Sequence, residues 1–177
     1  MIMNILKEWG SYIFIIVVVV LIRSYIVTPV IVRGDSMYDT LEDGEVLFLS
    51  KIHYVVSEIE RFDIVVVKDR DNDLIIKRVI GLPGDDIEYM DNVLYINGRE
   101  YKQNFVDDET EDFVLEDICE INDDDCSEGI PEGMYLTLGD NRDVSADSRV
   151  KGLIREEQIL GKTVFRIWPL NRISFVK

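Results

Sequence analysis

The chain has 177 residues, of which 47% are hydrophobic and 31% are charged, which suits one folded domain with an appendage. Its formal net charge is −16. Without a basic stripe to neutralise phosphates, the composition excludes a nucleic-acid partner. Two cysteines and one histidine cannot by themselves make a structural zinc site, so we expect neither a metal nor another cofactor.

The first element is an apolar segment near the N-terminus. The unbroken run from Tyr12 to Ile22 is too short to cross a bilayer core of about 30 Å. Trp9 to Thr28 gives twenty residues, enough for a span, with Arg23 as the only charge inside. We therefore predict a short tail over 1–8 and a retained transmembrane anchor over 9–28.

Two features of the sequence argue against alternatives to the anchor. A removable signal peptide ends in small residues of the Ala-x-Ala kind, but the only alanine in the chain is Ala146. A buried core helix would show an amphipathic stripe, whereas this run is apolar on all sides. The positive-inside rule hardly orients the anchor, because Lys7 before it competes with Arg23 and Arg33 near its other end.

Short runs rich in Val and Ile fill most of the remaining chain, separated by Asp-Asn, Pro-Gly-Asp and Asn-Gly turn signals. This spacing predicts a mainly β domain over 29–177, an antiparallel sandwich or barrel. Outside the anchor, the only helix-like stretch is 155–158. The predicted strands are Glu45–Leu49, Asp63–Val67, Leu74–Ile80, Ile87–Tyr89, Val93–Ile96, Tyr135–Leu138 and Thr163–Ile167.

An acidic insert covers about 103–130, with twelve Asp or Glu residues and no Lys or Arg. Its charge predicts an exposed loop or hairpin extension rather than part of a core. The aspartates after Asn122 lack the glycine and glutamate spacing of an EF-hand, so we favour a solvated loop over a calcium site. Cys119 and Cys126 lie here and could pair if the segment is outside the cytoplasm; the sequence leaves this open.

Three further stretches carry candidate chemistry. Gly34–Leu41 places Ser36 in a turn, where a serine is usually only a turn residue. Asp73–Asp85 places Lys77 in an apolar strand beside Arg78. Because neighbouring strand residues point to opposite faces, one of these two cations must sit among apolar side chains or find partners. Desolvation would lower the pKa of Lys77 and make it a general base, whereas an edge-strand lysine would reach water instead. The third stretch, Leu138–Arg149, is a dense polar loop.

Together these stretches resemble bacterial type I signal peptidases in content, order and spacing. The resemblance runs from about Trp9 to the C-terminus and leaves out the acidic insert. It implies that Ser36 is the nucleophile, Lys77 the base and Ser145 the residue that positions the lysine. A lysine at position 77 separates the chain from the endoplasmic-reticulum type, which carries histidine there. The implied supporting and oxyanion residues are Gly34, Met37, Arg78, Asp140, Asp147 and Arg149.

Three positions depart from the family pattern. Asp39 stands where proline is usual, and Phe62 replaces a usual glycine. Gly34 stands where some members have a serine that donates to the oxyanion. The oxyanion hole would then depend mainly on the backbone N–H of Ser36. These departures change local geometry and remove no catalytic group.

The resemblance implies a membrane-anchored serine endopeptidase that removes N-terminal signal peptides from exported preproteins. Ser36 lies eight residues beyond Thr28, so it can reach at most about 25–30 Å from the end of the anchor, where a signal peptide presents its cleavage site. We expect a single-pass protein of the plasma membrane, with preproteins and the lipid bilayer as partners and the catalytic domain on the extracytoplasmic side. The alternatives are a self-cleaving Ser/Lys repressor-type protein and a non-enzymatic anchored β domain that binds partners through its acidic segment.

Overall fold

The computed structural model describes residues 9–19, 27–50, 58–70, 72–106 and 108–176. Residues 9–19 form a helix with largely exposed apolar side chains. Within the described ranges, no helix combines the length and apolarity needed to cross a membrane. The predicted anchor runs through 20–26, which lie outside the described residues, to Thr28. Val27–Ile31 instead form strand β1, since β-branched residues around Pro29 disfavour helix there.

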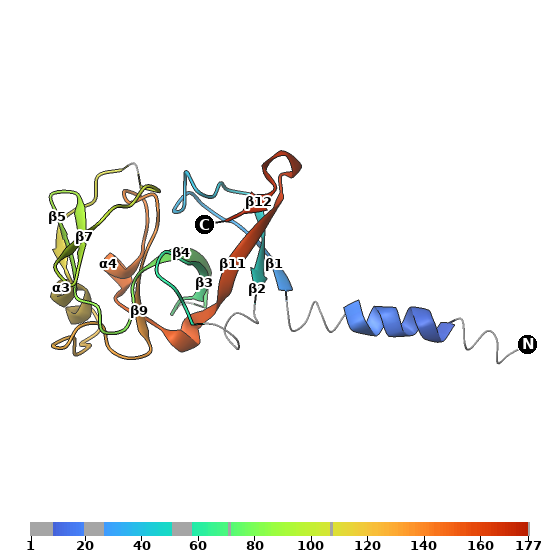
Figure 1. The fold of residues 1–177 in the computed structure, drawn as a ribbon, viewed down its shortest axis with the longest axis horizontal. Helices are drawn as coiled ribbons and strands as arrows, with labels where there is room; N and C mark the ends of the chain where they lie inside the picture. The colour runs from blue at the N-terminus through green and yellow to red at the C-terminus, as the bar shows by residue number, and fades with distance from the viewer. Residues whose placement is uncertain (1–8, 20–26, 51–57, 71, 107, 177) are drawn as a thin grey trace, which may run out of the picture.

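A large antiparallel sheet runs through the domain from β1 and β2 to β9 (Figure 1). Its strand order is β1-β2-β11-β3-β4-β9-β10, and β12 pairs with β11. Its other strands are β2 (Val46–Ser50), β3 (Ile64–Lys68), β4 (Leu74–Gly81), β9 (Met134–Leu138), β10 (Ile154–Arg155), β11 (Ile159–Trp168) and β12 (Ser174–Phe175).

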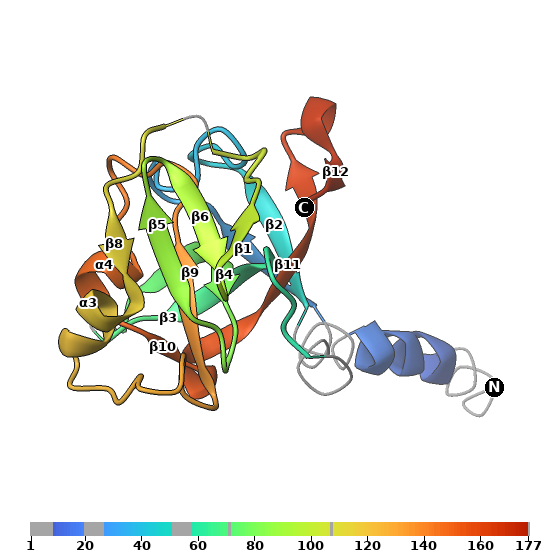
Figure 2. The ribbon, with the colours of Figure 1, turned by 60° about the vertical axis from the view of Figure 1, so that its left-hand side comes forward.

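A smaller antiparallel sheet has the order β7-β6-β5-β8. Its strands are β5 (Ile87–Met90), β6 (Val93–Ile96), β7 (Arg99–Tyr101) and β8 (Phe113–Val114). Buried side chains of this sheet, such as Ile87 and Leu94, share one hydrophobic cluster with Ile80 of β4 and Leu136 of β9. Figure 2 shows β5 and β6 lying in front of β4 and β9. The small sheet therefore packs against β4, which contains Lys77 and Arg78, and against β9, which leads into the polar loop.

The prediction of a mainly antiparallel β fold is confirmed, and all seven predicted strands are present with small boundary shifts. The last one is longer, because β11 starts at Ile159 rather than Thr163 and carries bulges that bend it between two partners. The predicted helical stretch at 155–158 is the 3₁₀ helix η1, Glu156–Gln158. The prediction that it would be the only helix outside the anchor is wrong, since Leu115–Glu120 (α3), Ser148–Lys151 (α4) and Leu170–Arg172 (η2) are also helical.

The acidic insert is more structured than predicted. Leu115, Ile118 and Cys119 recur at helical spacing, so α3 buries all three against the core and turns its acidic residues to water. Phe113 of β8 is buried as well. Cys119 and Cys126 form a disulfide across seven positions of sequence. The prediction that the insert, as an exposed loop or hairpin extension, contributes nothing to a core is wrong, because the charge count hid this apolar stripe.

Candidate active site

Ser36 lies in the loop between β1 and β2. Gly34 adopts a positive φ of 78° and donates its backbone N–H to Asp43 Oδ1 at 2.8 Å, which closes the loop on itself. The side chains of Met37 and Leu41 are buried in the core below the large sheet, and Leu41 donates its N–H to the Met37 carbonyl. Met37 therefore anchors the turn while Ser36 stays half-buried and reachable from solvent.

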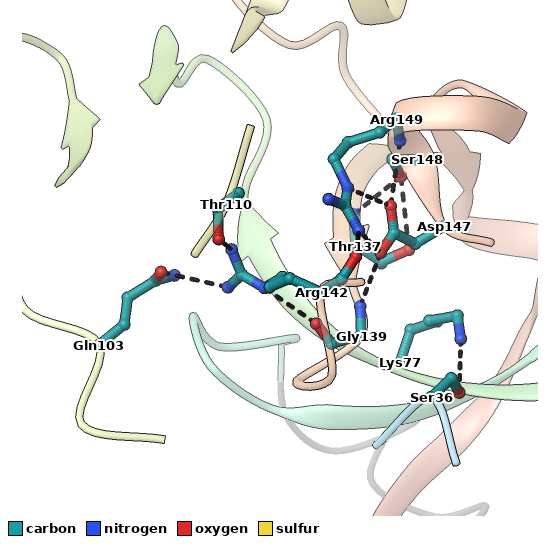
Figure 3. Close-up of polar contacts among 10 residues, drawn as sticks. All are labelled: Ser36, Lys77, Gln103, Thr110, Thr137, Gly139, Arg142, Asp147, Ser148 and Arg149. Carbon is teal, nitrogen blue, oxygen red and sulfur yellow. Dashed lines mark hydrogen bonds and ion pairs between the residues drawn. The ribbon is translucent and has the colours of Figure 1, made fainter. Parts of the chain in front are cut away.

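Lys77 comes from β4, between β3 and β9. Its side chain is only 3% exposed, and Val65 lies opposite it in β3. The Lys77 Nζ donates to Ser36 Oγ at 2.8 Å, which joins two of the three predicted stretches (Figure 3). An edge-strand lysine reaching water is therefore excluded.

The pKa of Lys77 is lowered from 10.5 to about 8. The largest cause is burial, which disfavours the charged ammonium. The carboxylates of Asp147 and Asp140 raise the pKa, while the positive charges of Lys151 and Arg149 lower it. With a pKa of about 8, about one-tenth of the lysine is neutral at pH 7 and able to accept a proton.

The nucleophile turn and the polar loop meet at Gly139, a residue that the sequence analysis did not single out. Asn141 donates its N–H to the Ser36 carbonyl at 3.2 Å, so the polar loop touches the nucleophile turn directly. A Cβ on Gly139 would overlap the Ser36 carbonyl oxygen and would lie 2.6 Å from Ser145 Cβ. Its place between a buried strand and a polar loop is the only sequence signal for this role.

Arg78 and Asp140 form a buried ion pair. Arg78 Nε donates to Asp140 Oδ1 at 2.8 Å, and Nη2 donates to Oδ2 at 2.6 Å. Thr40, missed in the sequence analysis, adds a hydroxyl donor to Asp140 Oδ2 at 2.5 Å, and the Phe62 carbonyl accepts from Arg78 Nη1. The pair ties β4 to the start of the polar loop and to the end of the nucleophile turn.

Asp147 organises the other end of the polar loop. It caps α4 by accepting from the Arg149 N–H and pairs with Arg149 Nε at 2.9 Å. It also accepts from the Gly139 N–H at 3.0 Å. Arg149 in turn donates to the Arg142 carbonyl at 2.7 Å. Asp147 and Arg149 therefore hold the backbone that contacts Ser36.

Ser145 is buried beside Gly139, but the structure gives it no hydrogen bond to Lys77. Its Oγ has no partner among the described residues. The implied role of Ser145 in positioning the lysine stays a prediction.

Phe62 adopts a φ of 69°, in the left-handed region that favours glycine. Its ring meets the Phe105 ring edge-on at 5.3 Å between centroids, and both pack on the core. The bulky side chain is thus accommodated rather than exposed.

A reachable serine hydroxyl, bonded to a buried amine of lowered pKa in an antiparallel β fold, is the arrangement expected of a serine peptidase with a lysine base. Comparisons with known proteins give the family. Residues 6–168 match the family model described as signal peptidase, peptidase S26. The chain belongs to this signal peptidase family and is an endopeptidase that removes signal peptides.

The relatives agree over nearly the whole chain. It is 39% identical over 180 residues to signal peptidase IB of Staphylococcus aureus (strain MRSA252), covering 96% of this chain and 93% of that protein. It is 38% identical over 178 residues to signal peptidase I of Bacillus caldolyticus, covering 96% and 94%. A crystal structure of a signal peptidase I from Enterococcus faecalis V583 matches with a TM-score of 0.54 and 36% identity, over 60% of this chain and 97% of that one.

We expect Gly139→Ala to lower the rate of preprotein cleavage by roughly 10- to 100-fold, because the added methyl group must push the polar loop off the Ser36 carbonyl. The measurement is kcat on a purified preprotein. Gly10→Ala is the matched control, since a Cβ there meets nothing within 4 Å. Wild-type kcat in Gly139→Ala would contradict the close approach of the two loops.

Proposed function

We propose that Ser36 is the nucleophile and Lys77 the general base of signal-peptide cleavage in this protein. The observation that carries the proposal is the 2.8 Å contact between a half-buried hydroxyl and a buried amine whose pKa is about 8. Neutral Lys77 Nζ accepts the proton of Ser36 Oγ, and the oxygen attacks the scissile carbonyl carbon. The Ser36 backbone N–H stabilises the resulting oxyanion.

The tetrahedral intermediate then collapses to an acyl-enzyme. The carbon–nitrogen bond breaks, and protonated Lys77 gives its proton to the leaving amine. The signal peptide remains as an ester on Ser36 Oγ. Lys77, neutral again, takes a proton from water, and the hydroxide oxygen attacks the acyl carbon. As the ester C–O bond breaks, Lys77 returns its proton to Ser36 Oγ, and the signal peptide leaves as a carboxylate.

The remaining implied residues have supporting roles in this proposal. Met37 fixes the nucleophile turn in the core, and Gly34 supplies the positive φ that closes it. Because Gly34 has no hydroxyl to donate to the oxyanion, the oxyanion hole depends mainly on the Ser36 N–H. Arg78 with Asp140, and Asp147 with Arg149, hold the polar loop, and we assign Ser145 to the same loop beside Gly139.

We also propose that the apolar segment beginning at Trp9 anchors the protein in the plasma membrane, with 1–8 as a tail and the peptidase domain beginning at β1. The all-round apolar sequence supports this. The disulfide between Cys119 and Cys126 supports an extracytoplasmic domain, because disulfides persist outside the reducing cytoplasm. The lipid bilayer and exported preproteins are then the partners. A non-enzymatic binding role for the acidic insert is disfavoured by the burial of α3 in the core.

Ser36→Ala and Lys77→Met should each abolish cleavage, with a loss on the order of 10⁴-fold or more, since the two side chains act as one unit. The measurement is the amount of mature protein released from a purified preprotein over time. Lys102→Ala is the control, because Lys102 is exposed in the loop that follows β7. Processing by Ser36→Ala at the wild-type rate would instead support the non-enzymatic alternative.

Cleavage should rise with pH through about pH 8, with tenfold loss per unit well below it, because only neutral Lys77 can accept the serine proton. Removing the positive charge in Lys151→Gln should raise the pKa of Lys77 and move this midpoint to higher pH. Lys102→Gln is the control. A profile that stays flat down to pH 5 would rule out Lys77 as the base.

The anchor is tested with two charges in its helical part, Phe14→Asp and Val17→Asp. Each aspartate at a span's centre costs roughly 2.5–3.5 kcal/mol, so the variant should leave the membrane fraction that retains the wild type. Val150→Asp with Leu160→Asp, both exposed on the peptidase domain, is the control.

The side of the membrane is tested separately. Protease added to intact protoplasts should digest the wild-type domain; protection of the domain would place it on the cytoplasmic side.

A further inference from the structure

Arg142 is a buried cation that makes no ion pair with the described residues. It lies in the loop after β9 and is only 2% exposed. The guanidinium donates to three neutral acceptors: Gly139 O at 2.9 Å, Thr110 Oγ1 at 3.0 Å and Gln103 Oε1 at 3.1 Å (Figure 3). It also lies 5.5 Å from the centre of the Tyr89 ring. Burial lowers its pKa, although arginine stays protonated.

These neutral acceptors are what make the buried charge tolerable. A buried guanidinium without hydrogen-bond partners carries a large desolvation penalty. Two of its three acceptors, Gln103 and Thr110, come from the acidic insert. Thr110 is itself buried and is held in place by its N–H bond to Asn92 Oδ1 at 3.0 Å. The insert is therefore built to hold Arg142.

Arg142 in turn holds the backbone behind the nucleophile. Its Nε binds the Gly139 carbonyl, while Asp147 binds the Gly139 N–H at 3.0 Å. Gly139 is thus fixed on both sides where it abuts the Ser36 carbonyl. Two residues on, Asn141 donates to that same carbonyl. A continuous set of contacts leads from Thr110 and Gln103 through Arg142 to the Ser36 turn.

A second contact of the insert points the same way. The ring of Phe105 covers the guanidinium of Arg78, with 3.9 Å between the guanidinium carbon and the ring centre. Arg78 follows Lys77 in β4 and binds Asp140, the residue after Gly139. The acidic insert thus contacts both Arg78, which follows Lys77 in β4, and Arg142, which holds the backbone next to Ser36.

We propose that Arg142 is a positioning residue for Ser36, and that Gln103 and Thr110 form a rear clamp that keeps Arg142 in place. The proposal rests on Ser36 being the nucleophile. The clamp acts through the backbone of Gly139 and Asn141 and touches neither substrate nor the reacting atoms. Its role is to hold the serine oxygen at attacking distance, so its loss lowers kcat and leaves KM nearly unchanged.

The test uses the full-length protein and a preprotein substrate. Thr110→Val keeps the volume of the side chain but removes the acceptor, and should lower kcat roughly tenfold with KM within about twofold. Thr110→Ser restores the hydroxyl and should restore most of kcat. In an Arg142→Met background, Thr110→Val should have no further effect, because the group that it serves is gone.

Controls separate positioning from folding. Glu109→Gln changes the exposed neighbour of Thr110 and should leave kcat unchanged. The folded fraction of each variant is measured by near-UV circular dichroism, and kcat is expressed per folded molecule. The pH midpoint should stay near that of the wild type, because Arg142 is not among the charges that shift the pKa of Lys77.

Three results would overturn the clamp. These are wild-type kcat in Thr110→Val, a loss that disappears when kcat is expressed per folded molecule, or an equal further loss in the Arg142→Met background. Ser36→Ala is run alongside. If it is inactive while Thr110→Val matches the wild type, only the clamp fails; if Ser36→Ala cleaves normally, the nucleophile assignment itself fails.

Discussion

The burial of the Lys77 amine is the constraint on which the rest of the structure depends. A pKa lowered from 10.5 to about 8 corresponds to about 3 kcal/mol against the protonated, folded state. Since the folded pKa lies below the unfolded one, this destabilisation is fully present below pH 8 and disappears as pH rises past about 10.5. At neutral pH the protein therefore carries a charge that its interior disfavours. The apolar strands β3, β4 and β9, with buried residues on both sides of Lys77, must supply the offsetting stability.

Two neighbouring cations in β4 are treated in opposite ways. Arg78 cannot lose its charge near neutral pH, so it receives a bidentate carboxylate from Asp140. Lys77 receives only a hydroxyl, because a direct carboxylate partner would raise its pKa and remove its basicity. The nearby carboxylates of Asp140 and Asp147 are each bound to an arginine, so they act on Lys77 only at a distance. Burial thus stays the largest influence on its pKa.

Local signals in the sequence were enough for the fold but not for the site. Val- and Ile-rich runs between turn residues predicted the longer strands except β1, whose first residues were assigned to the anchor. The strands β7, β8, β10 and β12 are too short to give a pattern. Strand alternation showed that Lys77 or Arg78 must be buried, but both are, and no periodicity could place Ser36 beside Lys77 across forty-one residues. The resemblance supplied that pairing. Gly139 and Arg142 were given no role of their own, because their roles come from contacts between loops and leave no mark in spacing.

Phe62 links the departures from the family pattern to the acidic insert. A non-glycine residue at a φ of 69° costs on the order of 1 kcal/mol or more, so it persists only where its side chain gains something in return. Here the gain is the edge-on contact with Phe105, a residue that the insert supplies and whose ring covers Arg78. The aromatic residue at 62 and the insert therefore fit each other, and a glycine at 62 would leave the Phe105 ring without this partner. In this chain the polar network around Arg78 is enclosed by both together, which makes the insert part of the peptidase domain rather than an addition to its surface.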